Sequence, residues 1–374
     1  MELQELCSYV KTKVETSNYS IEDYISTENM LPEKGGITIA SSFPSGKVTE
    51  FQENDILISN IRPYFKKIWR ANRSGCCSND VLCIRANNNV DAEFLYYLLS
   101  QDLFFAYVMS GANGSKMPRG DKQQIMNWEI EIPSEKEDQR RIASILSSLD
   151  RKIELNNKIN ADLEEMAQAI FKSWFVDFEP FKDGKFVDSE LGMIPEGWKV
   201  GTLGDFCNVF TGKKNTNQAI EKGLYPFFSC APEPLASNDA IFKGKAIIIA
   251  GNGSYTGRTM FYNGGFDLYQ RTYACTIREQ DKENLMIFFY HMMKQFFEPV
   301  KMGGTRGSSI PYIVMGDITQ QKFPYSKDWL IRFSNIANSM MDRKLRIDKE
   351  NSRLSLLRDT LLPRLMSGEL EVPE

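Results

Sequence analysis

Hydrophobic and polar positions alternate in two different ways along this chain. In residues 1–134 and 177–327, short apolar runs rich in β-branched and aromatic residues are separated by Gly, Asn, Ser and Pro, which is typical of strands and turns. Each segment also contains a helix-like apolar stretch, near 92–108 and near 283–298. We therefore predict two β-rich globular modules. The expected strands include 55–60, 81–85, 246–250 and 273–278.

Residues 135–176 and 328–374 have a helical period instead. The stretch 135–175 contains neither Gly nor Pro, and its apolar positions step by four and three, which predicts a long helix with a coiled-coil seam. Forty helical residues would extend roughly 60 Å. The seam positions are Ile142, Leu146, Leu149, Ile153, Asn156, Asn160, Leu163, Ala167, Ile170 and Trp174. A second stripe comprises Phe333, Met340, Ile347, Asn351, Leu354, Leu361 and Leu365.

Two arrangements of these helices are open. Each helix could simply cover its own module, or the two helices could pair antiparallel and hold the modules apart. We favour pairing, because an apolar seam of this length cannot stay exposed to water. In that arrangement the polar seam residues Asn156, Asn160 and Asn351 would fix the register of the pair at some cost in stability.

The sequence is internally duplicated. Sliding the chain on itself by 193 residues aligns 84–125 with 277–318 without a gap, and ten of the 42 pairs are identical. Average composition would give about two or three identities by chance. The triplet Asp-Arg-Lys occurs in both helical stretches, at 150–152 and 342–344. A period near 190 residues indicates a duplicated unit of one module followed by one long helix, rather than a solenoid.

Composition limits the function classes. A chain of 374 residues with 42% hydrophobic and 25% charged residues is ordinary globular protein of about two domains. Its 45 Lys and Arg against 49 Asp and Glu give a net charge of −4. The protein is therefore no polycation, and any contact with nucleic acid must come from local basic patches.

Cysteine and histidine usage excludes further classes. Seven cysteines show no Cys-x-x-Cys spacing, and the chain starts without a secretory signal pattern, so we expect reduced thiols in a cytoplasmic protein. No apolar run approaches the ~20 residues that a membrane-spanning helix needs. With His291 as the only histidine, we expect neither a histidine-ligated metal site nor a Ser-His or Cys-His nucleophile pair.

The first module contains a basic stretch with interleaved aromatic residues. Residues 56–79 have five Lys or Arg and no acidic residue, which suits phosphate contacts combined with apolar or stacking contacts to bases. A solvated strand pair would give the same pattern if Phe65 and Trp69 faced the core. The loop 111–122 adds glycines and small polar side chains that can approach a ligand closely. The candidate DNA-binding residues are Arg62, Tyr64, Lys66, Lys67, Asn113, Ser115, Lys116 and Arg119.

The second module has corresponding loops. Residues 251–258 occupy the place of 59–62 in the first module, and 303–311 match the 111–122 loop. These loops could also be no more than long turns. The candidate residues of the second module are Asn252, Tyr255, Arg258, Thr305, Arg306, Ser308 and Ser309.

Catalytic motifs are missing from the sequence. The segment GNGSYTG is not a G-x-G-x-x-G motif, and no G-x-x-x-x-G-K-[ST] phosphate loop is present, so nucleotide binding is not expected. The Asp-Arg-Lys triplets resemble half of a nuclease metal site, but they lie mid-helix without a partner carboxylate, so we interpret them as solvated helix surface. No Asn-Pro-Pro-aromatic tetrapeptide is present. We expect a DNA reader without catalytic chemistry.

Several segments resemble one known family. IPSEKEDQRRIASILSSLDRKIELNNKINADLEEMAQAIFKSWFVDFEPF (132–181), IPEGWKVGTLGDF (194–206) and LLRDTLLPRLMSGEL (356–370) are similar to segments of the DNA-specificity subunits of type I restriction–modification systems. NIRPYFKKI (60–68), GSKMPRGD (114–121) and SSIPYIVMGDI (308–318) resemble recognition-domain motifs of that family. The resemblance covers nearly the whole chain in the family's order.

The resemblance implies an α+β fold with a pseudo-twofold internal repeat. Two similar target recognition domains, 1–134 and 177–327, would be β-rich α/β modules, joined by two long antiparallel helices, 135–176 and 328–374, that form a coiled coil. Each domain would read one half of a bipartite asymmetric DNA target, and the helices would set the spacer.

The resemblance also implies partners. Two methyltransferase subunits would dock on the helices and bind S-adenosylmethionine, so no cofactor or metal is expected in this chain, and motor–nuclease restriction subunits could join the complex. The alternative from another class is a duplicated protein-interaction scaffold that ignores DNA. Salt-dependent retention on DNA would distinguish the two.

Overall fold

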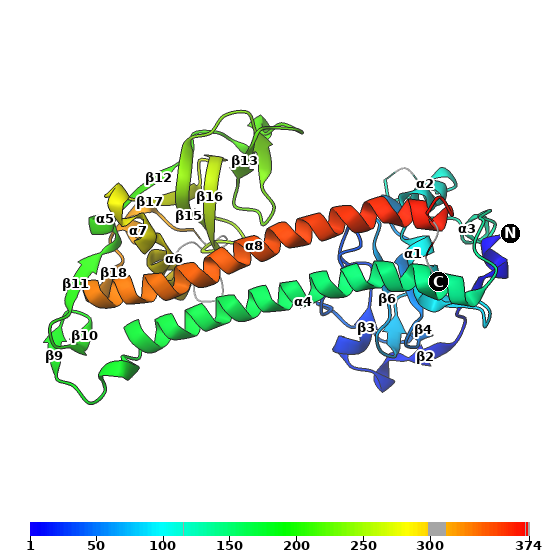
Figure 1. The fold of residues 1–374 in the computed structure, drawn as a ribbon, viewed down its shortest axis with the longest axis horizontal. Coiled ribbons are helices and arrows are strands. Elements are labelled where there is room, and N and C mark those ends of the chain that lie inside the picture. The colour runs from blue at the N-terminus through cyan, green and yellow to red at the C-terminus, as the bar shows by residue number, and fades with distance from the viewer. Residues whose placement is uncertain (115, 298–311, 371, 373–374) are drawn as a thin grey trace. The chain divides into compact units, whose positions relative to one another are not determined.

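The structure is a computed structural model that describes residues 1–114, 116–297, 312–370 and Val372 (Figure 1). The chain divides into two compact units, and each unit combines one module with parts of both long helices. The first unit comprises Met1–Asn156 and Lys349–Glu374, and the second comprises Asn157–Asp348.

The first module contains two four-stranded sheets. The two central strands of the first sheet read ILIS and VLCIRA, and such continuous apolar runs are typical of strands buried on both faces. In order across this sheet, the strands are β1 (Cys7–Tyr9), β8 (Val81–Ala86), β5 (Ile56–Ser59) and β6 (Ile68–Arg70). The second sheet has the order β2 (Lys13–Glu15), β4 (Lys47–Phe51), β7 (Gly75–Cys77) and β3 (Tyr24–Ile25).

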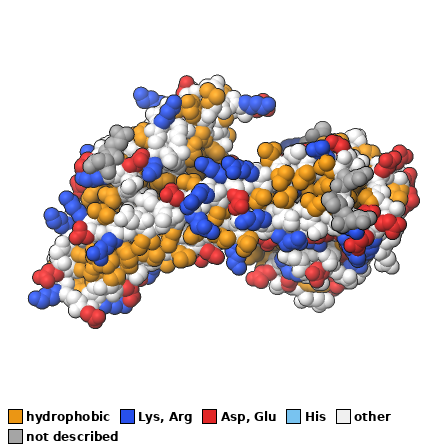
Figure 2. All heavy atoms as spheres, viewed as in Figure 1, with side chains coloured by type: hydrophobic (Ala, Val, Ile, Leu, Met, Phe, Trp, Pro, Cys, Tyr) orange, Lys and Arg blue, Asp and Glu red, His pale blue; other side chains and the backbone are white. Residues whose placement is uncertain are grey.

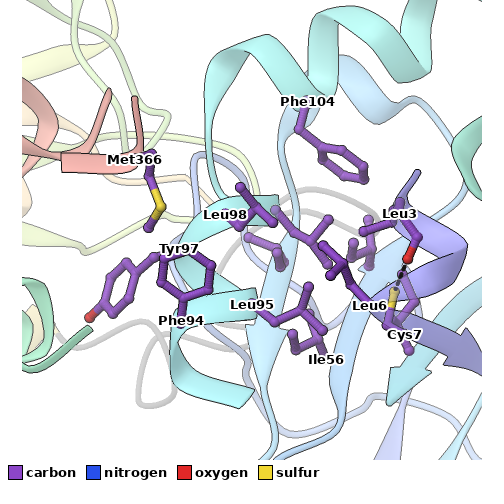
Figure 3. Packing of buried hydrophobic residues seen from close by; sticks show 14 of the residues in the cluster. Leu3, Leu6, Cys7, Ile56, Phe94, Leu95, Tyr97, Leu98, Phe104 and Met366 are labelled. Carbon is purple, nitrogen blue, oxygen red and sulfur yellow. Dashed lines mark hydrogen bonds between the residues drawn. The ribbon is translucent and has the colours of Figure 1, made fainter. Parts of the chain in front are cut away.

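Two helices, α1 (Ala92–Leu99) and α2 (Asp102–Ser110), complete the core of the first module. The side chain of Asp91 accepts hydrogen bonds from the first backbone amides of α1, which fixes where the helix begins. Figure 3 shows Phe94 and Leu95 of α1 beside Ile56 of β5, with Met366 from the end of the last helix near Tyr97. Each such fully buried large side chain contributes about 1.5–3 kcal/mol.

The second module repeats the first sheet and extends it. Its six-stranded sheet has the order β12 (Cys207–Thr211), β17 (Thr272–Ile277), β15 (Phe242–Ala250), β16 (Thr259–Leu268), β13 (Tyr225–Phe228) and β14 (Leu235–Ser237). The first four strands correspond in order to β1, β8, β5 and β6 of the first module. The core helix α6 (Met286–Phe297) then corresponds in position to α1. The duplication predicted from the sequence is therefore present in the fold.

The remaining elements are short. The short α-helices are α3 (Lys122–Met126), α5 (Leu203–Phe206) and α7 (Met315–Thr319). Two further strand pairs are β9 (Phe186–Ser189) with β10 (Gly192–Pro195), and β11 (Lys199–Thr202) with β18 (Lys322–Tyr325). The 3₁₀ segments are η1 (Leu3–Glu5), η2 (Thr16–Asn18), η3 (Ile21–Asp23), η4 (Pro63–Phe65), η5 (Glu179–Phe181), η6 (Thr216–Gln218) and η7 (Gln280–Leu285).

The two long helices, α4 (Lys136–Phe175) and α8 (Lys327–Met366), pack antiparallel. In the first unit Asn156 Nδ2 donates to Asn351 Oδ1 at 2.8 Å. In the second unit Asn160 Nδ2 donates to Asp348 Oδ1 at 2.7 Å. The partner of the later residue on α4 is therefore the earlier residue on α8, as in an antiparallel pair. This is the arrangement that we favoured over two helices that each cover their own module.

The predicted stripes face inward on both helices. All ten seam positions of α4 and all seven stripe positions of α8 are buried or half-buried. Polar seam residues find partners there: Asn156 is almost completely buried, and its amide also donates to Glu350 at 2.9 Å. The seam is therefore apolar with a hydrogen-bonded interruption, as expected of residues that specify register.

One interpretation from the sequence is wrong. Asp150, assigned to solvated helix surface, accepts a hydrogen bond of 2.7 Å from the Tyr97 hydroxyl and another of 2.7 Å from Arg358 Nη1. Burial raises the pKa of the Tyr97 phenol, and the neighbouring Asp150 charge raises it further. Within the triplet, Arg151 and Lys152 are exposed, as interpreted, but Asp150 joins the first module to both long helices, a role that sequence spacing alone does not reveal.

Candidate nucleic-acid interface

A strained turn follows β5 in the first module and carries three of the candidate residues, with a fourth, Lys67, directly after it. Residues 62–66 contain η4, and the flanking residues Arg62 and Lys66 have φ of 51° and 50°, a left-handed conformation that non-glycine residues rarely adopt. The backbone N–H of Arg62 donates to the Pro118 carbonyl at 2.8 Å. The fold thus brings this turn, which we call the 62–66 turn, against the 111–122 loop, the second segment selected from the sequence.

The guanidinium group of Arg62 has no partner among the described residues. Its Nε atom is buried without a hydrogen-bond partner, and the described part of the chain offers the group no ion pair. A buried donor without a partner costs about 1–3 kcal/mol. The side chain lines a cavity of about 570 Å³, which we call the reading groove; its other walls include Phe65, Lys67, Asp80 and segments 26–28 and 42–44.

The side chains of Lys67 and Tyr64 differ in their contacts and exposure. Lys67 Nζ donates to the Thr27 carbonyl at 2.7 Å and lies 5.9 Å from the centre of the Phe65 ring. Burial lowers the pKa of Lys67. The Tyr64 ring is 45% exposed, so it can stack on a ligand, whereas Phe65 is half-buried, as the alternative interpretation expected.

Lys66 points to another set of residues. Its Nζ lies 3.1 Å from Asp102 Oδ1 and 3.6 Å from Glu33 Oε2. Burial disfavours the charge of Lys66, but Asp102 and Glu33 outweigh this and raise its pKa. Lys66 is therefore a charged group that already has two carboxylate partners.

The 111–122 loop is closed by its own backbone. Asn113 and Arg119 exchange two backbone hydrogen bonds of 2.9 Å each. The Arg119 guanidinium lies 3.2 Å from Asp80, and both side chains are largely exposed. Lys116 is exposed at the tip. These side chains can reach a phosphate, while the exposed ion pair of Arg119 is weak enough to rearrange.

The second module presents its 251–258 loop at the same end of the equivalent strand, directly after β15. A side chain at Gly251 would place its Cβ 2.4 Å from the Arg271 carbonyl, so glycine is needed for the close passage of the two backbones. Asn252 forms an isolated β-bridge with Tyr312, as Ile61 does with Arg119 in the first module. The same kind of bridge thus occurs at equivalent places in the two modules.

The side chains of this second loop are more constrained. Arg258 donates from Nη1 to the Pro232 carbonyl at 3.0 Å and from Nη2 to the Ala231 carbonyl at 2.6 Å. Asn252 Oδ1 accepts a hydrogen bond of 3.0 Å from Cys230 Sγ. Tyr255 is 46% exposed. Of the three candidates in this loop, Tyr255 is thus the most accessible, whereas Arg258 organises the backbone of a neighbouring loop.

Five sequence candidates lie outside the described residues: Ser115, Thr305, Arg306, Ser308 and Ser309. Sequence reasoning also missed groups that the fold places beside the candidate residues. Cys230 touches Asn252, and Glu33 and Asp102 pair with Lys66. A search for basic and aromatic stretches passes over acidic and cysteine residues, and no short spacing connects these residues to the loops that they contact.

The surface of the long helices mixes apolar and charged side chains. Hydrophobic, basic and acidic groups alternate on the face visible in Figure 2. On α4, Leu155 and Met166 are 54% and 53% exposed, and on α8 Leu356 is 70% exposed. Large apolar side chains on otherwise polar helices are typical of surfaces that bind another protein.

The remaining chemistry-bearing groups are structural. His291 is 1% exposed, and its Nδ1 lies 2.9 Å from Gln168 Oε1. Burial lowers the pKa of His291 to about 4, so the ring is neutral near pH 7. Six of the seven cysteines are buried and all are free thiols. Within the described ranges, no group of three or more His, Cys, Asp or Glu could hold a metal ion.

No helix among the described residues is both long enough and apolar enough to cross a membrane.

Comparison with protein families gives one match over most of the chain. The family model described as "Type I restriction modification DNA specificity domain" matches residues 1–165 and 195–327. The first matched segment includes the first module and the second covers most of the second module, so the match follows the internal duplication.

Two curated relatives are similar over long segments. The chain is 28% identical to the type I restriction enzyme MjaIX specificity subunit of Methanocaldococcus jannaschii, over 77% of this chain and 71% of that protein. It is 23% identical to the type I restriction enzyme HindI specificity subunit of Haemophilus influenzae, over 98% of each.

A solved structure has the same fold. The crystal structure of the S subunit of a type I restriction–modification system from M. genitalium superposes with a TM-score of 0.59 at 18% identity. The superposition covers 98% of this chain and 95% of the other. The fold with two β-rich modules and two long antiparallel helices is therefore shared with that protein.

Proposed function

The chain belongs to the family of type I restriction–modification DNA specificity subunits, and on this premise we propose that each of its modules reads one half of a bipartite, asymmetric DNA target. It is a non-catalytic component of a type I complex. In this proposal the target recognition domains are residues 1–134 and 177–327, and the spacer helices are residues 135–176 and 328–374.

The Arg62 guanidinium is the observation that carries the proposal. A buried donor without a partner, on a strained turn at the edge of the reading groove, gains free energy when a ligand supplies acceptors. A guanidinium group pairs best with two acceptors side by side, as guanine O6 and N7 present them in the major groove. The exposed Lys116 and Tyr64 lie in the same module and suit phosphate and stacking contacts.

The divergence of the two modules accounts for an asymmetric target. Their loops follow equivalent strands, and the Nε atoms of Arg62 and Arg258 are both buried without a partner. The Arg258 guanidinium, however, donates from Nη1 and Nη2 to two carbonyls, whereas the described residues give the Arg62 guanidinium no partner. The two modules would therefore contact their half-sites through different side chains. Two half-sites one DNA turn apart are separated by about 34 Å, and a helix of 40 residues, about 60 Å long, is a spacer of suitable scale.

Partners follow from the helices and the family. We propose that two methyltransferase subunits dock on the exposed apolar side chains of α4 and α8, bind S-adenosylmethionine and methylate adenine, and that motor–nuclease subunits join this complex. Leu155, Met166 and Leu356 supply apolar contact area for such docking. The cofactor would belong to the partner, because no loop of this chain has a nucleotide-binding motif.

Methylated-base sequencing tests the proposal. DNA is taken from cells that express this chain with its methyltransferase subunit, and from cells that express the subunit alone. A bipartite adenine-methylated motif that appears only with this chain is the expected result. If the complex assembles and no motif appears, the result favours an inactive variant or the scaffold. A chain that shows no salt-dependent retention on DNA would support the scaffold.

A further inference from the structure

The side chains of residues 62–67 divide between two cavities. Arg62, Phe65 and Lys67 line the reading groove, whereas Lys66 lines a second cavity of about 290 Å³. The second cavity is bounded by Asp102 at the start of α2 and by the last turns of α8. Although Arg62 and Lys66 are only four residues apart, they therefore face different surroundings.

Ion pairs hold Lys66 in the second cavity. Its Nζ lies 3.1 Å from Asp102 and 3.6 Å from Glu33, and Lys34 Nζ lies 3.5 Å from the same Asp102 carboxylate. The pKa of Asp102 is lowered, because the hydrogen bond from Lys66 and the charge of Lys34 outweigh the effect of burial. Carboxylates of the same module neutralise the charge of Lys66, so a contact between Lys66 and a DNA phosphate would gain little.

Backbone strain is concentrated at the same place. Six non-glycine residues of the described chain have positive φ, and four of them are Glu33, Lys34, Arg62 and Lys66. The N–H of Glu33 donates to the Phe65 carbonyl at 2.8 Å, and the N–H of Lys34 donates to the Lys66 carbonyl at 3.0 Å. A strained backbone conformation persists only where surrounding contacts stabilise it. The two backbone hydrogen bonds between residues 33–34 and residues 65–66 therefore hold the 62–66 turn in its conformation.

We propose that Glu33, Lys34 and Asp102 form a latch that binds Lys66 and thereby positions the Arg62 guanidinium in the reading groove. Lys66 is then a positioning residue for recognition of the first half-site and makes no direct contact with DNA. The inference rests on the proposed function and deepens it, because it assigns a role in DNA specificity to two acidic side chains that DNA phosphates would repel.

A double-mutant cycle on the full chain in complex with its methyltransferase subunits tests the latch. The variants are Lys66→Met, Asp102→Asn and the double variant. The probes are a duplex with the methylated motif of the wild-type complex and a duplex with its first half-site scrambled. Affinity for both duplexes is measured between about 50 and 200 mM salt, where each phosphate contact contributes about one unit to the slope of log K against log salt.

The latch predicts the same change from either partner. Each single variant should lower the ratio of cognate to scrambled affinity about tenfold, the size of one lost base contact, with the salt slope unchanged. The double variant should be no worse than the poorer single variant, because both substitutions break one interaction. Thermal midpoints of all variants should stay near wild type, and Lys66→Arg, which keeps the charge, should retain most of the ratio.

A direct phosphate contact by Lys66 would overturn the proposal, and two results would show it. Lys66→Met would weaken binding to both duplexes equally and would reduce the salt slope by about one. Asp102→Asn would then strengthen binding to both duplexes, because it removes a repelling charge. Lys182→Met, which breaks the exposed 2.7 Å ion pair with Glu179 in the second unit, serves as the matched control and should change neither quantity. A wild-type complex that prefers neither duplex would refute the proposed function itself.

Discussion

The hydroxyl of Tyr290 in α6 donates a hydrogen bond of 2.9 Å to Glu164 in α4. The same carboxylate binds Lys294 of α6 at 2.7 Å and Lys344 of α8. Burial alone would raise the pKa of Glu164, but the two lysines outweigh it and lower the pKa to about 2. One carboxylate therefore links the second module to both long helices.

The first module uses the same device at a different position. Tyr97, the repeat counterpart of Tyr290, donates to Asp150 of α4, which also binds Arg358 of α8. Asp150 and Glu164 both lie on α4, so the two carboxylates are not counterparts in the duplicated sequence. The tyrosine occurs at equivalent positions of the two modules, whereas the carboxylate that it contacts is determined by how the long helices pack in each unit.

Replacing Glu164 by Gln should destabilise the second unit. The variant removes the charge that pairs with Lys294 and Lys344, whose side chains are 24% and 22% exposed. We expect a loss of about 2 kcal/mol in the free energy of unfolding, measured by urea denaturation. Glu165→Gln, on an exposed neighbour, should change it by less than about 0.5 kcal/mol. Equal effects of the two variants would contradict the linking role of Glu164.

The same carboxylate should contribute to acid sensitivity. Its pKa is about 2 in the folded chain against an ordinary value of 4.5, so its stabilisation is complete above pH 4.5 and is lost as pH falls towards 2. The unfolding free energy of the wild type should therefore fall more steeply than that of Glu164→Gln across this window. Parallel curves for the two proteins would show that the Glu164 charge is not stabilised by folding.

His291 should give a second pH dependence at higher pH. Its pKa is about 4 when folded against 6.5 when unfolded, so the unfolded chain binds the extra proton between these values. Stability should therefore rise with pH from about 4 to 6.5, by at most about 1.4 kcal/mol per pH unit. His291→Gln should remove this contribution. The test is the difference between wild-type and variant unfolding free energies, which should change across that interval and be flat above pH 7.

Arg62→Ala should impair the first half-site alone. If the guanidinium group pairs with a base, cognate binding weakens by about 1–3 kcal/mol, and the motif becomes degenerate at one position. Methylated-base sequencing of the variant complex gives the position. The second half-site, read by the other module, should remain unchanged and is the internal control. Equal weakening of cognate and scrambled DNA would identify Arg62 as a phosphate contact instead.

Arg258→Ala should act differently from Arg62→Ala. Arg258 donates to the carbonyls of Ala231 and Pro232, so its loss leaves two acceptors without that donor and loosens a loop. We expect a lower thermal midpoint and weaker methylation of the whole second half-site, without relaxation at a single base. A variant with wild-type stability and one degenerate position would show that Arg258 reads a base directly.

Leu163→Glu should disrupt the helix seam. Leu163 is half-buried in α4, and a charge there must be desolvated without a partner, at a cost of about 2 kcal/mol or more. Lower unfolding free energy and loss of co-purification with the methyltransferase subunit are expected. Ala161→Glu, on an exposed position of the same turn, tests whether any added charge has this effect on stability. Full recovery of partner with Leu163→Glu would refute the seam.

The sequence by itself determined the architecture. The step of four and three places Leu146, Asn156 and Leu163 on one face of a helix, and the same positions are buried or half-buried in the structure. The 193-residue offset predicted two like modules, whose central strands recur in the same order. Periodicity and duplication depend on neighbours along the chain, so they can be read without knowing which distant segments meet.

Only the tertiary structure decided what each charged side chain contacts. Lys66 and Arg62 belong to one basic stretch, yet the fold gives Lys66 two carboxylates and leaves the Arg62 guanidinium without a partner among the described residues. Asp150 looked solvated because its partner Arg358 is far away in sequence. The pairing of charges is set by which residues folding brings within a few ångströms. The pattern of residues along the sequence shows which side chains share one face of a helix or strand, but not which segments pack against that face.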